Sequence, residues 1–486
     1  MLRRPAKQPT MGGTLHAATH KRLVPLAALV APLLLGILAM FYPLAVLSAC
    51  FAGATLWLMW LAPKTAALLI VVVVLFKNLA TPIHPLPKFL DEALVLAFAL
   101  VVILRQLALQ RGFRRLPGST WFLVYLFAGA ASSVVNSVPL SITMQDAYLF
   151  LKGALFCASV CQLEWRVPDV HRILRGARVV LLVVFAITAV NLAMPGAWAA
   201  MFSIPGAVDV RGGFISLIGP FEHPGLFGQI MSLALAALVS YATVYRSTVG
   251  VQLAVAASIL GVVASFRRTA ALAALAAVTV VLSATQRTRR TFAVLAILVT
   301  PAIAIESWHA IATIVSGTYS SYVASPGPVA RIALYQTAGD IVQAQFPLGV
   351  GLGRYGGFIA QQHYSPVYYQ YGLDEIYGLS PGGDFAQDTF WPAVAGEAGL
   401  VGLVAYIGGL VSLLAVARRL ISSHVRELKF LGLLCAAWWV EYAIESVASP
   451  VYSAPPQYLL LFGAFGIAIA LGKTEEEHSI ERESRG

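Results

Sequence analysis

Long apolar runs, broken by short polar segments, repeat along almost the whole chain. A helix that crosses a bilayer needs about 20 predominantly apolar residues, and runs near that length recur often enough to predict about 12–14 transmembrane helices. The sequence therefore predicts an all-α polytopic membrane protein. The expected spans are residues 23–42, 44–62, 65–81, 89–108, 119–136, 145–161, 177–194, 224–244, 249–266, 269–285, 291–307, 391–417, 430–448 and 457–472.

Lys and Arg residues follow every second expected span, as Arg114, Arg175 and Arg418 illustrate. Cytoplasmic loops of membrane proteins collect Lys and Arg, so this alternation predicts that both termini are cytoplasmic and that the chain lies in a bacterial inner membrane. The expected regions are a cytoplasmic tail (1–22), transmembrane helices (23–307), a large periplasmic loop (308–390), further transmembrane helices (391–472) and a second cytoplasmic tail (473–486).

Composition agrees with this class. Hydrophobic residues make up 59% of the 486 residues and charged residues only 11%, whereas an ordinary soluble domain has about a quarter charged residues. The net charge of +11 follows from the basic cytoplasmic loops, so a nucleic-acid partner is not implied. The four cysteines lie in apolar runs without the spacing of a zinc site or a disulfide framework. We expect no metal and no cofactor.

The expected loop 308–390 is too long to be a simple connection, and long loops in compact proteins are usually functional. Within it, residues 328–346 have the pattern of an amphipathic helix. The loop is rich in aromatic residues, among them Tyr335, Tyr355, Tyr377 and Phe385. Exposed aromatic rings beside polar groups can stack on sugars, but tyrosines near a membrane also form interfacial belts. The sequence leaves both interpretations open.

Four arginines fall on the face where the topology rule disfavours them: Arg211, Arg267, Arg268 and Arg331. The planar guanidinium group binds two phosphate oxygens at once. Arginines at the outer membrane surface therefore indicate an anionic partner, such as a lipid-linked phosphate or pyrophosphate. Ordinary lipid headgroups are the alternative.

Several motifs on this face resemble the core of the O-antigen ligase and polymerase superfamily. They are Arg211-Gly212, Gly219–Pro224, Ser265–Arg268, Arg331 with Pro347–Gly353, and Asp388–Trp391 leading into Glu397–Gly402. The resemblance covers roughly residues 205–405. The spans before and after this region match only in being hydrophobic.

The resemblance implies a metal-independent, inverting glycosyltransferase that moves a glycan from undecaprenyl pyrophosphate to a sugar hydroxyl on the periplasmic face. By similarity, Arg211 and one of Arg267 or Arg268 would hold the donor pyrophosphate and stabilise it as leaving group. The implied partners are the lipid-linked donor, the glycan acceptor and the bilayer, with a chain-length regulator as a further candidate. The expected substrate-binding residues are Arg331, Glu222, His223, Asp384, Tyr335 and Tyr355.

The chain departs from the ligase pattern at Asp388-Thr389, where ligases of the family carry a histidine. We interpret Asp388 as the base that removes the acceptor proton. This departure favours an exopolysaccharide or O-antigen polymerase over an O-antigen ligase or a protein O-oligosaccharyltransferase. The alternative for Asp388 is that it caps a helix beginning at Phe390. Asp384 and Glu222 are the rival carboxylates.

A different class of function also has support in the sequence. Lys152, Glu441 and Glu445 lie within apolar spans, and ionisable groups inside a membrane are functional candidates. They favour a polysaccharide transporter or flippase. Against it, the chain lacks paired, Gly/Pro-broken spans in matching halves.

Overall fold

The computed structural model describes residues 43–80, 89–203, 208, 210–211, 214–284 and 330–483. The expected spans 23–42 and 291–307, and residues 308–329 of the expected loop, lie outside these ranges. The chain divides into two compact units between Ala62 and Pro63. The first unit contributes one described helix, α2 (Pro43–Leu61).

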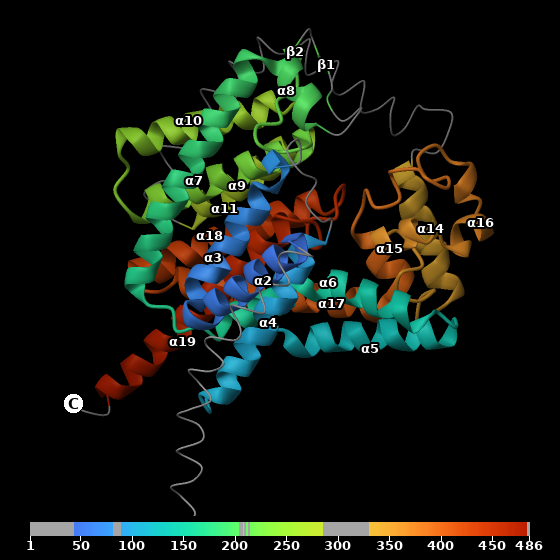
Figure 1. The fold of residues 1–486 in the computed structure, drawn as a ribbon, viewed down its shortest axis with the longest axis horizontal. Coiled ribbons are helices and arrows are strands. Elements are labelled where there is room, and N and C mark those ends of the chain that lie inside the picture. The colour runs from blue at the N-terminus through green and yellow to red at the C-terminus, as the bar shows by residue number, and fades with distance from the viewer. Residues whose placement is uncertain are drawn as a thin grey trace, which may run out of the picture. The chain divides into compact units, whose positions relative to one another are not determined.

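The second unit holds the remaining elements, and nearly all of them are helical (Figure 1). They are α3 (Pro63–Leu75), η1 (Lys77–Ala80), α4 (Leu90–Ala108), α5 (Ser119–Val135), α6 (Leu140–Cys161), α7 (Val167–Ala193), α8 (Pro195–Phe202), β1 (Val210–Arg211), β2 (Phe214–Ile215), α9 (Pro224–Val244), α10 (Val249–Ala264), α11 (Arg268–Ser283), α14 (Ala330–Ala344), α15 (Phe358–Gln362), α16 (Pro366–Gln370), η3 (Leu373–Glu375), α17 (Trp391–Ile421), α18 (Arg426–Glu445) and α19 (Gln457–Glu483).

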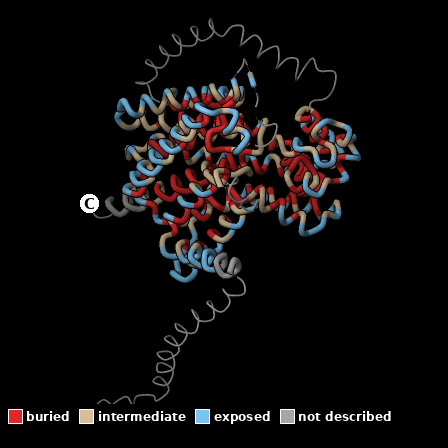
Figure 2. Tube along the Cα trace, turned by 45° about the horizontal axis from the view of Figure 1, so that its top comes forward, coloured by how far each residue is buried: buried red, intermediate tan, exposed pale blue. Residues whose placement is uncertain are grey.

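Helix length and hydropathy confirm the all-α polytopic membrane class. Among the described residues, α7, α9, α17 and the part of α19 up to Glu475 are each long and apolar enough to cross a bilayer. Five shorter apolar helices, within α2, α3, α5, α10 and α11, add to them. Only 6% of the most apolar window of α7 is buried, against 61% for α9. Thus α7 presents its surface to lipid, while α9 lies inside the bundle, where Figure 2 shows the buried residues concentrated.

Most helices begin and end close to the expected bounds, but α7 and α19 are longer. Helix α7 begins at Val167, ten residues before the expected start of its span, because Asp169 accepts the backbone N–H of Arg166 at 3.0 Å and satisfies a free donor of the first turn. Helix α19 continues past residue 472 through charged residues with good helix propensity. There, Lys473 donates to the carbonyl of Arg115 at 3.1 Å.

Residues 330–390 form a separate group of elements beside the bundle, drawn in yellow to orange in Figure 1. The amphipathic helix expected at 328–346 is present as α14. It packs with α15, α16 and η3 around a core that includes Leu334, Ile341, Tyr355 and Tyr368. This part of the expected loop is therefore folded around its own apolar centre.

A break in α17 joins this group to the bundle. Gly399 has φ 71° and ψ −167°, which interrupts the helical ladder. The carbonyls of Gly396 and Glu397 instead accept the N–H groups of Val350 and Gly351 at 2.9 and 3.0 Å. Backbone groups freed by a kink at membrane depth need such partners. The glycine-rich segment 347–353 thus fastens the group to α17.

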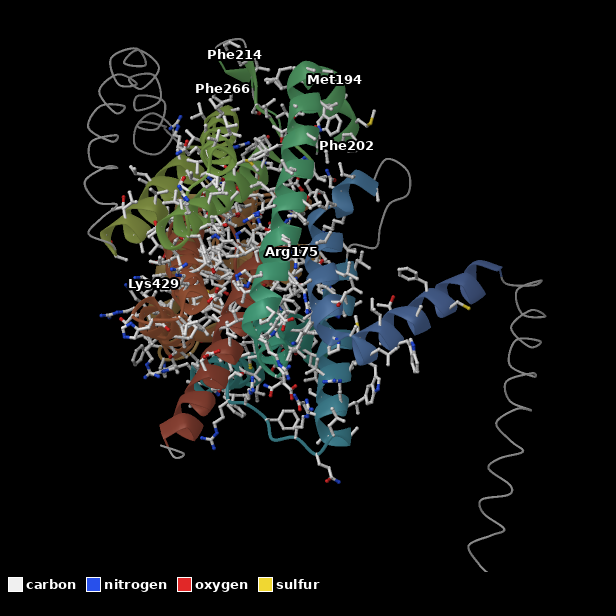
Figure 3. All side chains as sticks on the ribbon, turned by 90° about the vertical axis from the view of Figure 1, so that its left-hand side faces the viewer. Arg175, Met194, Phe202, Phe214, Phe266 and Lys429 are labelled. Atoms are coloured by element: carbon white, nitrogen blue, oxygen red, sulfur yellow. The ribbon has the colours of Figure 1, made fainter. Side chains whose placement is uncertain are left out.

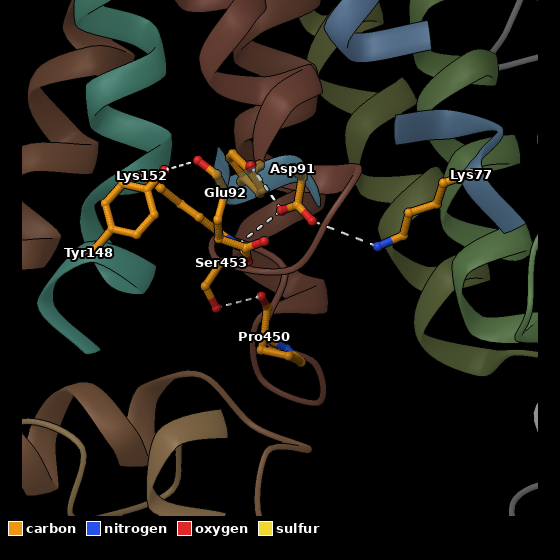
Figure 4. A network of polar contacts seen from close by, with 8 residues as sticks. Lys77, Asp91, Glu92, Tyr148, Lys152, Pro450 and Ser453 are labelled. Carbon is orange, nitrogen blue, oxygen red and sulfur yellow. Dashed lines mark hydrogen bonds and ion pairs between the residues drawn. The ribbon is translucent and has the colours of Figure 1, made fainter. Parts of the chain in front are cut away.

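The buried charge Lys152 is paired rather than isolated (Figure 4). Its Nζ lies 3.2 Å from Asp91 and 2.5 Å from Glu92, and Lys77 approaches Asp91 at 3.8 Å. The Tyr458 hydroxyl also donates to Asp91 at 3.0 Å. Because these residues come from α4, α6, α19 and η1, the network ties four elements together and accounts for Lys152 structurally.

The two ends of the helices differ in the residues that they carry. Figure 3 places Met194, Phe202, Phe214 and Phe266 at one end, with Arg175 and Lys429 farther toward the other. The turn that contains Phe266 leads directly into Arg267 and Arg268. Arg267 and Arg268 therefore begin α11 at the end that Phe266 marks.

Candidate functional site

The expected site residues come from six segments of the chain that are distant in sequence. Five of the segments are the start of α9, the turn before α11, helix α14, the connection between α14 and α15, and the loop before α17; Arg211, on strand β1, adds a sixth. Helix α11 packs against both α9 and α18, and α14 packs against α17. At the end of α18, the Ser446 hydroxyl accepts from the Trp391 indole at 2.9 Å, and the Val447 carbonyl accepts from Tyr335 at 3.0 Å. These contacts join α14, α17 and α18.

Arg267 and His223 face each other at the starts of α11 and α9. Phe266 has φ 51°, so the chain turns sharply between α10 and α11 and directs Arg267 toward α9. Arg267 Nη2 lies 3.4 Å from His223 Nε2. His223 Nδ1 accepts the N–H of Gly225 at 2.9 Å, so a neutral ring carries its proton on Nε2. The Arg267 guanidinium group and the His223 ring therefore lie next to each other at the starts of α11 and α9.

His223 makes two contacts at the start of α9. It caps α9 through the Gly225 N–H, and it contacts an arginine of the candidate site. Of the adjacent arginines, Arg267 is half-buried against α9, whereas Arg268 is exposed as the first residue of α11. The structure thus separates the two arginines that the sequence treated as equivalent.

Arg331 and Asp388 form an ion pair, with Arg331 Nη2 3.0 Å from Asp388 Oδ2. Each side chain is about one-third exposed, so the pair is accessible from solvent. Burial raises the pKa of Asp388 above that of an ordinary aspartate, while the Arg331 and Arg267 guanidinium groups lower it and the Asp384 charge raises it. Asp388 therefore lies in the electrostatic field of both arginines.

Asp388 does not cap α17. The helix begins at Trp391, its cap residue is Phe390, and no side chain caps it. The alternative that the sequence offered for Asp388 is therefore wrong. The Phe390 ring packs against Tyr452 and Tyr406 at centroid distances of 5.0 and 5.1 Å, which fixes the chain directly after Asp388.

Glu445 belongs to the same region, which the sequence did not indicate. It is 5% exposed, lies within hydrogen-bonding reach of the Thr269 hydroxyl, and interacts with the charges of Arg331 and Arg267. Glu441, one turn earlier on α18, accepts from the Gln229 amide at 3.4 Å. The i, i+4 spacing of the two glutamates was visible in the sequence, but their partners were not.

Tyr335 and Tyr355 have different environments. Tyr335 is 38% exposed on α14, near Arg331. Tyr355 is fully buried, and its hydroxyl donates to the Leu334 carbonyl at 2.6 Å. The expectation that Tyr355 contacts sugar is therefore corrected. Its ring lies in the apolar core of residues 330–390, and its hydroxyl group bonds to α14.

The other expected residues lie around this centre. Asp384 is exposed and close enough to Asp388 to affect its pKa. Glu222 is half-buried and lines a small pocket with Lys77 and Asn78. Arg211 lies in the two-residue strand β1, where its backbone pairs with Phe214. The Arg211 side chain lies outside the described part of the chain.

Asp146, which the sequence analysis did not single out, forms a buried carboxyl pair with Glu397, the first residue of the motif 397–402. Both side chains are fully buried, and they interact electrostatically with each other. Glu397 Oε1 also accepts the N–H of Tyr355 at 2.9 Å. The pair holds the backbone that carries Tyr355, and Tyr355 in turn holds α14 with Arg331. Within the ranges that the structure describes, no group of three His, Cys, Asp or Glu residues could hold a metal ion.

Comparison with known proteins finds a similarity over part of the chain. Residues 253–407 match a family model described as O-antigen ligase. The match includes Arg267, Arg331, Asp388 and the break at Gly399, and it begins after Arg211 and His223. No curated protein matches the chain. The resemblance predicted from the sequence motifs is confirmed over this range.

Proposed function

We propose that this membrane protein, whose residues 253–407 match a family model described as O-antigen ligase, transfers glycans from a polyprenyl-pyrophosphate donor to a sugar hydroxyl. The observation that carries the proposal is the accessible Asp388–Arg331 pair within reach of the Arg267 charge. A carboxylate and two guanidinium groups are the parts that a pyrophosphate leaving group and a hydroxyl nucleophile require.

Arg267 and His223 form the donor side of the proposed site. The Arg267 guanidinium group lies 3.4 Å from the His223 ring, and its planar fork of N–H groups suits phosphate oxygens. As the sugar–phosphate bond breaks, negative charge grows on the leaving pyrophosphate, and fixed cations stabilise that charge. Arg211 joins them in the proposal by family resemblance.

Asp388 forms the acceptor side. Its Oδ2 is held by Arg331, which leaves Oδ1 for the acceptor hydroxyl. The hydroxyl oxygen attacks the anomeric carbon and forms the new glycosidic bond. The bond from that carbon to the phosphate oxygen breaks, and its electron pair leaves with the undecaprenyl pyrophosphate. The hydroxyl proton moves to Asp388, and attack from the face opposite the leaving group inverts the anomeric configuration.

The acceptor in this proposal is another lipid-linked repeat, so that the protein acts as an exopolysaccharide or O-antigen polymerase on the periplasmic face. Asp388, in the place of the ligase histidine, supports this choice. The pairing of Lys152 within the fold weakens the case for a transporter, because it gives that buried cation a structural role.

The direct test uses purified protein in lipid nanodiscs, supplied with undecaprenyl-pyrophosphate-linked oligosaccharide from a producing strain. We expect longer lipid-linked glycans and one released undecaprenyl pyrophosphate per bond formed. Transfer only after lipid A core is added would instead identify a ligase. In proteoliposomes, movement of the lipid-linked glycan across the bilayer without a new bond would identify a transporter.

Arg267→Ala and Arg268→Ala provide a matched pair of variants for the donor side. We expect Arg267→Ala to lose about 100-fold or more in transfer rate, as when a donor to a developing oxyanion is removed. Arg268→Ala, at an exposed position, should cause a smaller loss of transfer rate. Equal losses, or a larger loss for Arg268→Ala, would show that phosphate binding does not follow the geometry at His223.

A further inference from the structure

The turn that precedes Asp388 carries two exposed aromatic rings. Tyr377 is 88% exposed and Phe385 is 38% exposed. Their centroids are 6.0 Å apart, and the planes meet at 71°, so the rings form a corner. The two rings leave apolar surface in contact with water, and burying that surface would be favourable in free energy. A partner that covers the rings would recover it.

The backbone fixes this corner in place. Gly378 has φ 83°, and a Cβ at this position would overlap the Phe385 ring. The N–H of Phe385 donates to the Gly378 carbonyl at 2.9 Å, and the N–H of Gly383 donates to Ser380 at 2.8 Å. One face of the Phe385 ring therefore lies on glycine backbone. The Phe385 ring is held in advance of binding, which lowers the entropic cost of a ligand.

The aromatic corner is linked directly to Asp388. The N–H of Asp388 donates to the Phe385 carbonyl at 3.1 Å. Such a turn keeps its first and fourth Cα atoms within about 7 Å of each other. A sugar ring stacked on Phe385 therefore lies near the backbone of Asp388.

The charges around the corner select between possible occupants. Between Tyr355 and Phe390 the chain has four acidic residues, Asp374, Glu375, Asp384 and Asp388, and no Lys or Arg. Anionic lipid surfaces attract basic segments and are repelled by this one. Carboxylates and carbonyls accept hydrogen bonds from hydroxyl groups. Apolar rings with surrounding acceptors are complementary to a neutral sugar, which has C–H faces and O–H edges.

We infer that Tyr377 and Phe385 form a subsite for a neutral sugar ring of the glycan acceptor, stacked so that its reactive hydroxyl reaches Asp388. This inference rests on the proposed function and names its acceptor subsite. An acidic sugar at this position is disfavoured, because the exposed Asp384 lies between Tyr377 and Phe385 in the sequence, directly before Phe385.

The test measures binding separately from turnover. The probe is the free oligosaccharide repeat, released from its lipid by mild acid, and its Kd for the full-length protein in nanodiscs is measured by calorimetry. We expect Tyr377→Ala combined with Phe385→Ala to weaken binding by about tenfold, or about 1.4 kcal/mol. Tyr377→Ala alone, at a nearly fully exposed side chain, should weaken binding without affecting folding. Tyr377→Trp, which keeps a stacking face, should bind near the wild-type level.

Tyr369→Ala is the matched control, since Tyr369 is another aromatic residue of the same group and is 57% exposed. Its Kd should not change. An unchanged Kd in the Tyr377 variants, or an equal loss in the Tyr369 variant, overturns the inference. The inference is also overturned if the Tyr377 variants lose binding to phosphatidylglycerol vesicles while their Kd for the oligosaccharide stays unchanged. Wild-type protein that binds the repeat but makes no glycosidic bond refutes the proposed function and leaves the subsite standing.

Discussion

At the scale of single residues, the site depends on how Asp388 is held. Arg331 binds one carboxylate oxygen at 3.0 Å, and the backbone around Asp388 is fixed by the Phe385 carbonyl on one side and the packed Phe390 ring on the other. A base held in this way is oriented before the acceptor arrives, which is how positioned groups accelerate proton transfer.

Asp388→Asn tests the base directly. The substitution is nearly isosteric but cannot accept the acceptor proton, so turnover should fall by about 100- to 10,000-fold while donor binding persists. Turnover is measured as glycan product in nanodiscs, and donor binding by calorimetry. Asp384→Asn and Glu222→Gln are the controls at the rival carboxylates. Near-normal turnover in Asp388→Asn would instead indicate that Asp384 or Glu222 is the base.

The Arg331–Asp388 pair also predicts a pH dependence. A base must be ionised, so turnover falls as pH drops through the pKa of Asp388, which burial raises above the ordinary aspartate range. Arg331 lowers this pKa. Removing the guanidinium charge with Arg331→Gln should therefore shift the acid limb of the pH–rate profile to higher pH. Arg268→Gln should leave the position of the limb unchanged, and a limb that stays fixed in Arg331→Gln would contradict the pairing.

At the scale of elements, the break in α17 positions the site. Gly399 allows the helix to interrupt its ladder, and residues 347–353 bind the freed carbonyls. The buried Asp146–Glu397 pair holds the following backbone through Tyr355. Arg331 lies on α14, and Asp388 lies directly before α17. The two residues meet because the segment after α14 is hydrogen-bonded to the kink in α17.

Gly399→Ala should disrupt this arrangement. The residue has φ 71°, and an added Cβ would overlap the backbone of Leu348; left-handed backbone alone costs a non-glycine residue about 1–3 kcal/mol. Thermal stability in detergent and transfer activity should both fall. Gly339→Ala on α14 is the matched control, since nothing lies within 4 Å of its added Cβ. Alanine there should be neutral or stabilise the helix by about 0.5–1 kcal/mol. Equal effects of the two substitutions would exclude a special role for the kink.

At the scale of the whole molecule, the proposed reaction depends on orientation in the membrane. Cysteine accessibility tests it in a background without Cys50, Cys157, Cys161 and Cys435. Glu375→Cys, at an exposed position of the 330–390 group, should react with an impermeant thiol reagent in cells with a permeabilised outer membrane. His424→Cys, between α17 and α18, should react only after lysis. The reverse pattern would place the site in the cytoplasm and refute the proposal.

The sequence by itself determined the membrane class, most helix bounds and a short set of candidate residues. Apolar runs and basic connections are local features, because lipid and the two aqueous sides act on each segment separately. Helix α9 begins and ends at the expected residues because its apolar run is such a local feature. The motif around Arg267 could be recognised because its residues are adjacent in the sequence.

The tertiary structure decided which candidates meet. Local sequence cannot show that Arg267 turns toward His223 while Arg268 is exposed, that Arg331 binds a carboxylate 57 residues away, or that Tyr355 is buried. These outcomes depend on contacts between segments distant in sequence, which form only when the kink at Gly399 and the packing of α11 against α9 and α18 bring those segments together.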